Sequence, residues 1–143
     1  MTAGLPDVNV LLALMWPQHI GHLAARAWLR GHAATGWATT PITESGFVRL
    51  SCNRAVVQAP TDPPGALAAL AQLTAVGNHR FVADEVVGVL APQFVSHVRG
   101  HRHVTDAHLL SICAQAGLTM VTFDRGMTSL APRNSALIHV LDT

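Results

Sequence analysis

The chain has 143 residues, of which half are hydrophobic and 12% are charged, and its formal net charge is +1 with the histidines neutral. This composition excludes a disordered chain, because disordered chains combine low hydrophobicity with high net charge. It also excludes nucleic-acid binding that depends on a large basic patch. The length favours a single domain over residues 1–143. Because so much of the chain is apolar, we expect a partner or a second copy to cover part of its surface.

The sequence shows no sign of a membrane span or an export signal. The longest stretch without Asp, Glu, Lys or Arg covers residues 8–25, but polar residues and a proline interrupt it. The N-terminus lacks the basic start and apolar core of a signal peptide, so we expect a cytoplasmic protein. Cys52 and Cys113 have no metal-type CxxC spacing, which favours two thiols in a reducing compartment.

Hydrophobic periodicity and capping residues predict alternating strands and helices. In the first half we predict a short strand over residues 3–6, a helix over 8–14 capped by Asp7, a helix over 21–30, a strand over 37–39, and a helix over 41–52 capped by Thr40. In the second half we predict a loop over 59–65, a helix over 66–75, a strand over 80–83, a helix over 92–98, a loop over 100–103, a helix that Thr105 caps and Gly117 ends, and strands over 118–123 and 136–141.

This alternation predicts the α/β class, as a three-layer α/β/α sandwich with a mainly parallel sheet and helices on both faces. Residues 118–123 are continuously apolar, which is typical of a strand buried on both faces. Ligands of such sheets bind beyond the carboxyl ends of the strands. Asp7 and Asp124 each follow a predicted strand, and Asp106 begins a predicted helix, so all three are expected at that edge.

Four of the eight acidic residues stand next to apolar runs, where an unpaired carboxylate is costly to desolvate. Each has a purely structural explanation when it is taken alone. Asp7 is explained as a helix N-cap, Asp106 as a first-turn acid that complements the helix dipole, Asp124 as a turn residue, and Glu44 as a solvated helix position.

Helix faces and electrostatics favour a shared site instead. Residues three or four apart lie on one face of a helix, so Glu44 shares its face with Phe47, and Asp106 shares its face with Leu110. Two unit charges about 4 Å apart repel by roughly 4 kcal/mol at an effective dielectric constant of 20. Converging carboxylates therefore require protons or a divalent cation, and an all-oxygen site selects Mg²⁺ or Mn²⁺.

The acids also stand in a recognisable order of motifs. These are Asp7-Val8-Asn9-Val10-Leu11-Leu12, then Glu44, then Thr105-Asp106-Ala107-His108-Leu109-Leu110, and then Val121-Thr122-Phe123-Asp124-Arg125-Gly126. With these motifs the chain resembles the PIN-domain nucleases over nearly its whole length, and more narrowly the VapC toxins of bacterial toxin–antitoxin pairs. It departs from their pattern at the start, where only a short segment interrupted by Pro6 precedes the first Asp.

The resemblance implies a ribonuclease that hydrolyses RNA phosphodiester bonds with Mg²⁺ (or Mn²⁺). It implies that Asp7, Asp106 and Asp124 are metal ligands and that Glu44 orients or deprotonates the attacking water. Asn9 would position Asp7 or a bound water. It also implies a small cognate antitoxin protein that holds the enzyme inactive, and a homodimer.

Two other functions remain open from the residues. One is a phosphatase-like hydrolase of small phosphoesters, which usually has a second Asp two residues after its nucleophile. This chain has Asn9 at that position, which counts against such an enzyme. The other is a non-catalytic PIN module that binds RNA or protein, although the presence of all four acids does not suggest a loss of activity.

Thr105, Arg102 and Arg125 are further candidates for binding or orienting the substrate, because they flank the acids Asp106 and Asp124. Arg125 could equally form an ion pair with one of those acids. The nearby histidines leave three interpretations open, namely a zinc site, contacts to RNA phosphates, or a solvated loop; they are His97, His101, His103 and His108.

Overall fold

Five parallel strands form one sheet in the computed structural model, which describes residues 2–143. The strands are β1 (Gly4–Pro6), β2 (Trp37–Thr39), β3 (His79–Phe81), β4 (Thr119–Thr122) and β5 (Ile138–Val140), in the spatial order β3-β2-β1-β4-β5. Every neighbouring pair is parallel. The predicted mainly parallel sheet is therefore confirmed, and all of its strand pairs are parallel.

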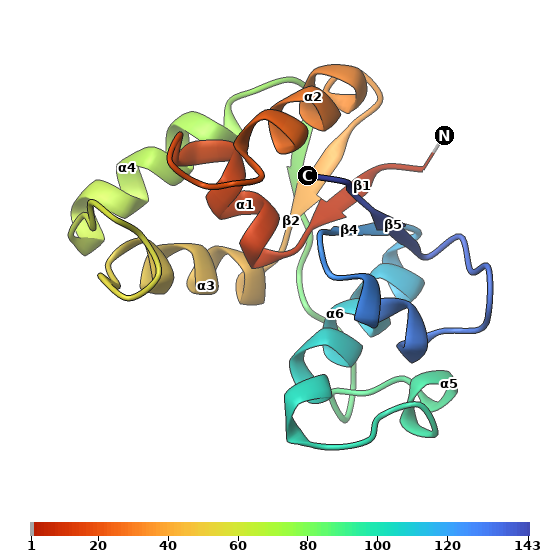
Figure 1. Ribbon diagram of the computed structural model, residues 1–143. Coiled ribbons are helices and arrows are strands. Elements are labelled where there is room, and N and C mark those ends of the chain that lie inside the picture. The colour runs from red at the N-terminus through yellow and green to blue at the C-terminus, as the bar shows by residue number, and fades with distance from the viewer. Residues whose placement is uncertain (1) are drawn as a thin grey trace.

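Helices cover both faces of this sheet, which makes the predicted three-layer α/β/α sandwich (Figure 1). One layer contains α1 (Val8–Met15), α2 (His22–His32), α3 (Pro41–Ser51) and α4 (Pro63–Thr74). The other contains α5 (Pro92–Val95), α6 (Val104–Ala116) and the 3₁₀ helix η2 (Arg125–Leu130), and a second 3₁₀ helix, η1 (His101–His103), leads directly into α6. Within residues 2–143, no helix is long and apolar enough to cross a membrane.

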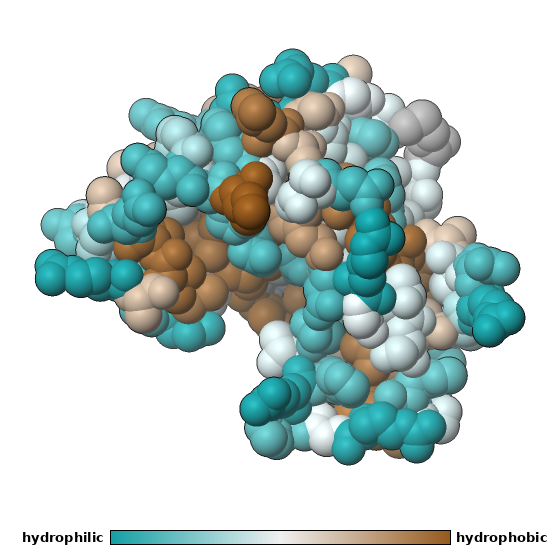
Figure 2. All heavy atoms as spheres, viewed as in Figure 1, coloured by the Kyte–Doolittle hydropathy of each residue, from teal (hydrophilic) through white to brown (hydrophobic). Residues whose placement is uncertain are grey.

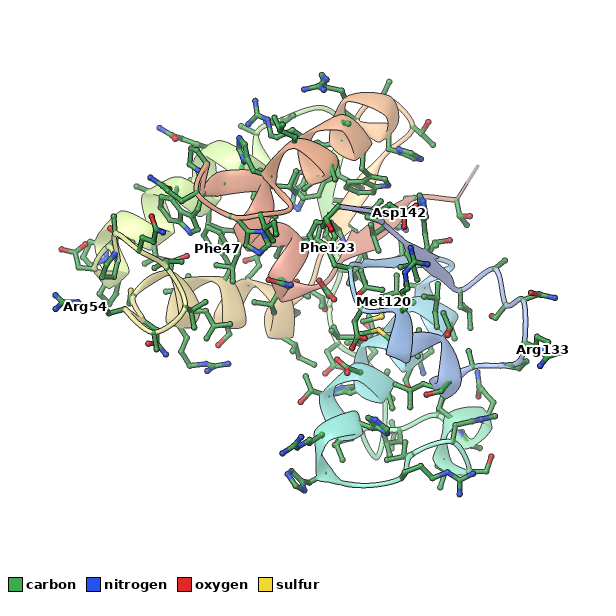
Figure 3. The ribbon with its side chains drawn as sticks, viewed as in Figure 1. Phe47, Arg54, Met120, Phe123, Arg133 and Asp142 are labelled. Carbon is green, nitrogen blue, oxygen red and sulfur yellow. The ribbon has the colours of Figure 1, made fainter. Side chains whose placement is uncertain are left out.

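Alternating side chains of the strands divide the core into two clusters. Because successive residues of a strand point to opposite faces, Trp37 and Val121 pack with α1 to α4, whereas Leu5 and Met120 pack with α5 and α6. Figure 3 shows Phe47 in the first of these layers and Met120 at the sheet beside the second. The central strands β1, β2 and β4 are thus buried on both faces, as the apolar run over residues 118–123 predicts for β4, whereas the edge strands β3 and β5 are more exposed.

Several predicted boundaries are wrong for local reasons. Helix α4 begins at Pro63 inside the predicted loop over 59–65, because the Asp62 side chain accepts from Gly65 N and prolines fit the first turn. The helix predicted over 92–98 ends at Val95. Beyond it the backbone bonds span only three residues, from His97 N to Phe94 O and from Val98 N to Val95 O, so α-helical bonding does not propagate.

The start of α6 also differs from the prediction. Residues 101–103 of the predicted loop form η1, and α6 follows without a break at Val104. Thr105 is therefore an exposed residue of the first turn and not the helix cap. Gly117 ends α6 in the left-handed conformation, with φ at 69°, as predicted. Strand β4 ends at Thr122, so Asp124 lies two residues beyond the strand and does not follow it directly.

Candidate active site at the carboxyl edge of the sheet

The strand order creates a switch point between β1 and β4. The chain extends the sheet from β1 towards β2 and β3 on one side, and towards β4 and β5 on the other. Ligands of open α/β sheets bind at such a point, beyond the carboxyl ends of the strands. Asp7 directly follows β1, and Asp124 lies two residues beyond β4. Two of the candidate acids therefore come from the two strands that flank the switch.

Asp7 is the most deeply buried of the candidate acids, with 9% of its surface exposed. It caps α1, because its Oδ1 accepts from Val10 N at 3.0 Å, and its Oδ2 accepts from the Thr122 hydroxyl at 2.6 Å. Burial raises the pKa of Asp7 to about 6 against these two hydrogen bonds, and the charges of Asp106 and Asp124 raise it further. A carboxylate is thus held where its charge is unfavourable.

Thr122 joins two of the acids and was missed as a site residue by the sequence analysis. Its hydroxyl donates to Asp7 and accepts from the backbone N–H of Asp124 at 3.0 Å. The Asp124 side chain in turn accepts from Gly126 N at 2.8 Å, which begins η2. The only signal in the sequence was a hydroxyl at the carboxyl end of an otherwise apolar strand, just before an acid.

Asp106 approaches the same site from the other helical layer. It is half-buried in the first turn of α6, on the face that carries the buried Leu109 and Leu110, as predicted. Burial and the charge of Asp124 raise the pKa of Asp106, whereas nearby His103 lowers it. The charges of Asp106 and Asp124 also raise the pKa of Asp7, so the structure brings these three aspartates close enough to interact electrostatically.

Glu44 makes different contacts from the three aspartates. It lies half-buried in the first turn of α3, beyond the carboxyl end of β2, with Phe47 on its face fully buried. Its Oε2 accepts from the Thr39 hydroxyl at 2.5 Å, and the same hydroxyl lies 2.8 Å from His79 Nε2. Glu44 therefore lies on the predicted edge of the sheet, but its carboxylate is bonded to Thr39 of β2, which in turn is bonded to His79 of β3.

The oxygen donors suit a hard divalent cation, although the side chains are not arranged around one. Within residues 2–143, no three Asp, Glu, His or Cys side chains lie close enough together to ligate a single ion. Asp7 and Asp124 instead accept hydrogen bonds from backbone N–H groups. The chemistry nevertheless fits Mg²⁺ or Mn²⁺, because a cation would relieve the unfavourable charge of buried Asp7.

The remaining candidates lie at the periphery. Asn9 is exposed and its Oδ1 contacts His19 Nε2 at 2.8 Å, so in this structure it is not bonded to Asp7. Arg125 forms an ion pair with Asp142, and both side chains are largely exposed. The predicted ion pair between Arg125 and one of the four candidate acids is therefore not observed. Thr105 in α6 and Arg102 in η1 are also exposed, and both precede Asp106 in the sequence.

The histidines near Asp106 do not form a metal centre in the described part of the chain. His108 Nε2 lies 2.8 Å from Asp84 Oδ2, which ties α6 to the loop after β3. His101 is exposed, and His103 is half-buried and acts electrostatically on Asp106. The zinc interpretation is therefore not supported by the side-chain arrangement of residues 2–143.

Comparison with known proteins agrees with this geometry. The family model described as PIN domain matches residues 5–131. The chain belongs to the PIN-domain family. It is 46% identical to Ribonuclease VapC39 of Mycobacterium tuberculosis over 99% of this chain and 100% of that protein. It is 46% identical to Ribonuclease VapC38 of the same species over 89% of each chain, and 35% identical to Ribonuclease VapC44 over 95% of this chain and 96% of that one. The resemblance to the VapC-type PIN domains is therefore confirmed, and all three coupled aspartates lie within the matched segment.

Proposed function

We propose that this PIN domain is a divalent-metal-dependent endoribonuclease, which acts in the cytoplasm as the toxin of a toxin–antitoxin pair. The observation that carries the proposal is the buried carboxylate of Asp7 at the switch between β1 and β4, coupled to Asp106 and Asp124. The similarity to proteins named Ribonuclease VapC supports RNA as the substrate.

We assign to the four acids the roles that the resemblance to PIN-domain nucleases implies. The residues that would hold Mg²⁺ or Mn²⁺ are Asp7, Asp106 and Asp124, because these aspartates interact electrostatically with one another. When bound, the cation supplies positive charge that stabilises the phosphorane oxygens and lowers the pKa of a water. Glu44 orients the attacking water and takes its proton, as the water oxygen bonds to phosphorus. The bond from phosphorus to the leaving sugar oxygen breaks, and that oxygen takes up a proton from solvent.

The peripheral residues are assigned to the substrate. Arg102 and Arg125 are exposed and close in sequence to Asp106 and Asp124, and guanidinium groups can pair with RNA phosphates. Asn9 and Thr105 are exposed polar side chains close in sequence to Asp7 and Asp106, and we assign them to orienting the water or the phosphate.

The decisive assay is cleavage of RNA by the purified chain with Mg²⁺ or Mn²⁺, in parallel with DNA of the same sequence. We expect the unchanged protein to cut RNA, and Asp7→Asn, Asp106→Asn and Glu44→Gln each to lose most of that activity. Glu85→Gln is the matched control, because Glu85 is an exposed acid in the loop after β3. Chelation of the cation should abolish cleavage by every active variant.

The outcomes separate the candidate functions. Equal cleavage by the unchanged protein and by Asp7→Asn and Asp106→Asn would refute the assignment of these acids. Turnover of a small phosphoester without RNA cleavage would favour the phosphatase-like alternative. No cleavage, together with no effect of divalent ions on the melting temperature, would favour a non-catalytic module, since a ligand that binds only the native state must stabilise it.

We also propose a small antitoxin partner and a homodimer. Several large apolar side chains are exposed, including Ile20 at 89%, Leu23 at 81% and Leu67 at 56%. Figure 2 shows hydrophobic side chains at the surface over the layer of helices α1 to α4. Surfaces of this kind are typical of sites that a partner covers. The test is to express the chain with and without the protein that the adjacent reading frame encodes, if that protein is short. A genuine antitoxin forms a stable complex and suppresses RNA cleavage, and light scattering reports whether the chain alone is dimeric.

A further inference from the structure

A hydrogen-bonded chain separate from the three aspartates links side chains of three elements. Thr39 ends β2, His79 begins β3, and Glu44 lies in the first turn of α3. The Thr39 hydroxyl lies 2.5 Å from Glu44 Oε2 and 2.8 Å from His79 Nε2. Thr39 has no exposed surface, so bulk water does not compete for its hydroxyl.

The single proton of the Thr39 hydroxyl fixes the direction of this chain. An ionised carboxylate only accepts hydrogen bonds, so the hydroxyl donates to Glu44. The hydroxyl oxygen must then accept from His79, and His79 Nε2 must carry a hydrogen. Burial lowers the pKa of His79 more than the charge of Glu44 raises it, so the neutral ring dominates near pH 8. In that neutral ring, Nδ1 is the nitrogen without a hydrogen.

The His79 ring is itself held in place by a fixed aromatic neighbour. The rings of Trp37 and His79 meet edge to face, with centroids 4.7 Å apart. Trp37 is fully buried and its indole N–H donates to Val76 O at 2.9 Å, so it is a rigid support. The parallel register places Trp37 beside His79 and Thr39 beside Phe81. Trp37 and Thr39 are two residues apart and share one face of β2, so the His79 ring beside Trp37 reaches Thr39 diagonally along that face.

We infer that Thr39 and His79 are positioning residues, which fix the Glu44 carboxylate for RNA hydrolysis; this role rests on the function proposed above. The hydrogen bond from the Thr39 hydroxyl occupies Oε2 of Glu44, so we assign Oε1 to the attacking water. A carboxylate at the start of a helix would otherwise rotate between several rotamers. Holding a catalytic group within a fraction of an ångström matters, because a displacement of about 1 Å can lower the rate about 100-fold.

Paired substitutions separate positioning from general structural damage. Thr39→Val keeps the shape and removes the hydroxyl, whereas Thr39→Ser keeps the hydroxyl. We expect Thr39→Val to lower kcat about 10- to 100-fold with little change in KM for RNA. Thr39→Ser should keep most of the kcat that Thr39→Val loses. At position 79, Gln retains an N–H donor at a similar reach and Leu does not. His79→Leu should lower kcat as Thr39→Val does, and His79→Gln should restore most of the kcat that His79→Leu loses. If Thr39→Val does not fold, the pair at the half-buried position 79 decides the question.

A second readout does not depend on catalysis. Two-bond ¹H–¹⁵N spectra of the histidine-labelled full chain at pH 8 report which ring nitrogen of His79 carries the hydrogen. We expect the Nε2–H tautomer in the unchanged protein and a mixture of tautomers in Thr39→Val. An Nδ1–H tautomer in the unchanged protein, or equal kcat for Thr39→Ser and Thr39→Val, overturns the inference. If the unchanged protein cuts no RNA, the proposed function fails and the catalytic role fails with it, but the spectra still decide the hydrogen-bonded chain independently.

Discussion

Replacing Asp7 by Asn should make the metal-free protein more stable at neutral pH, although it should destroy activity. The native pKa of Asp7 lies at about 6, above the ordinary value of 3.8. The folded state therefore holds this proton more tightly than the unfolded state does. Stability is greatest while Asp7 is protonated, falls as the pH rises from 3.8 to about 6, and stays low above that range.

The size of the effect follows from the pKa difference. At 1.36 kcal/mol per pKa unit, moving from 3.8 to about 6 corresponds to about 3 kcal/mol. The amide keeps an oxygen for Val10 N, but its NH2 group replaces the oxygen that accepts from the Thr122 hydroxyl, and the loss of that hydrogen bond costs about 1–2 kcal/mol. The net expected gain for Asp7→Asn is therefore about 1–2 kcal/mol. With an unfolding entropy of about 300 cal/mol/K for a chain of 143 residues, this raises Tm by about 3–7 °C.

The assay is thermal and urea unfolding in EDTA at pH 7.5 and at pH 4. Asp62→Asn is the matched control, because Asp62 also caps a helix but is exposed. We expect Asp7→Asn to exceed the unchanged protein in stability at pH 7.5, to lose that advantage at pH 4, and Asp62→Asn to change little at either pH. A destabilised Asp7→Asn at pH 7.5, or the same difference at both pH values, would refute the assignment of an unfavourable charge to Asp7.

Three further predictions concern single contacts. Thr122→Val removes a hydrogen bond that lowers the pKa of Asp7, so the pKa of Asp7 should rise above 6, as measured by ¹³C NMR titration of the carboxyl group; an unchanged titration curve would contradict this. Gly46→Ala places a Cβ 2.6 Å from Val8 Cγ2 where α3 crosses α1, and urea unfolding should show a loss of about 1–3 kcal/mol. Gly117→Ala meets no neighbouring atom within 4 Å but stands at a φ of 69°, so its cost should be smaller, about 1 kcal/mol; a larger loss for Gly117 than for Gly46 would reverse that ranking.

The parts of the fold that depend on local signals could be predicted from the sequence. Asp7 and Thr40 stand where helices begin, Pro41 fits a first helical turn, and Gly117 ends α6 with a positive φ. Strand alternation with helices predicted the sheet class. The stop of α5 after one turn was not predictable in the same way, because no proline or glycine follows Val95 directly.

The side-chain bonds that define the site could not be predicted, because they join residues far apart in the chain. Thr122 and Asp7 are 115 positions apart, and Thr39 and His79 are 40 apart. Both bonds depend on strand register, which pairs Pro6 with Val121 and Trp37 with His79. A periodic pattern shows that a strand exists and which side chains share a face. It does not show which neighbour lies opposite, and so the residues that hold the acids stayed hidden.

The three coupled aspartates differ in how much a bound cation would stabilise their negative charge, and the ranking of the three follows from how exposed each side chain is. Asp7 is buried, Asp106 is half-buried and Asp124 is exposed. Water already solvates the charge of Asp124, so a cation gains little by replacing that solvent, whereas the charge of Asp7 is poorly solvated and is opposed by both neighbours. In the proposed metal site the deepest carboxylate is therefore expected to contribute most to binding a cation, and it is also the residue whose ionised form most weakens the fold. Stability and the proposed metal affinity thus oppose each other at Asp7.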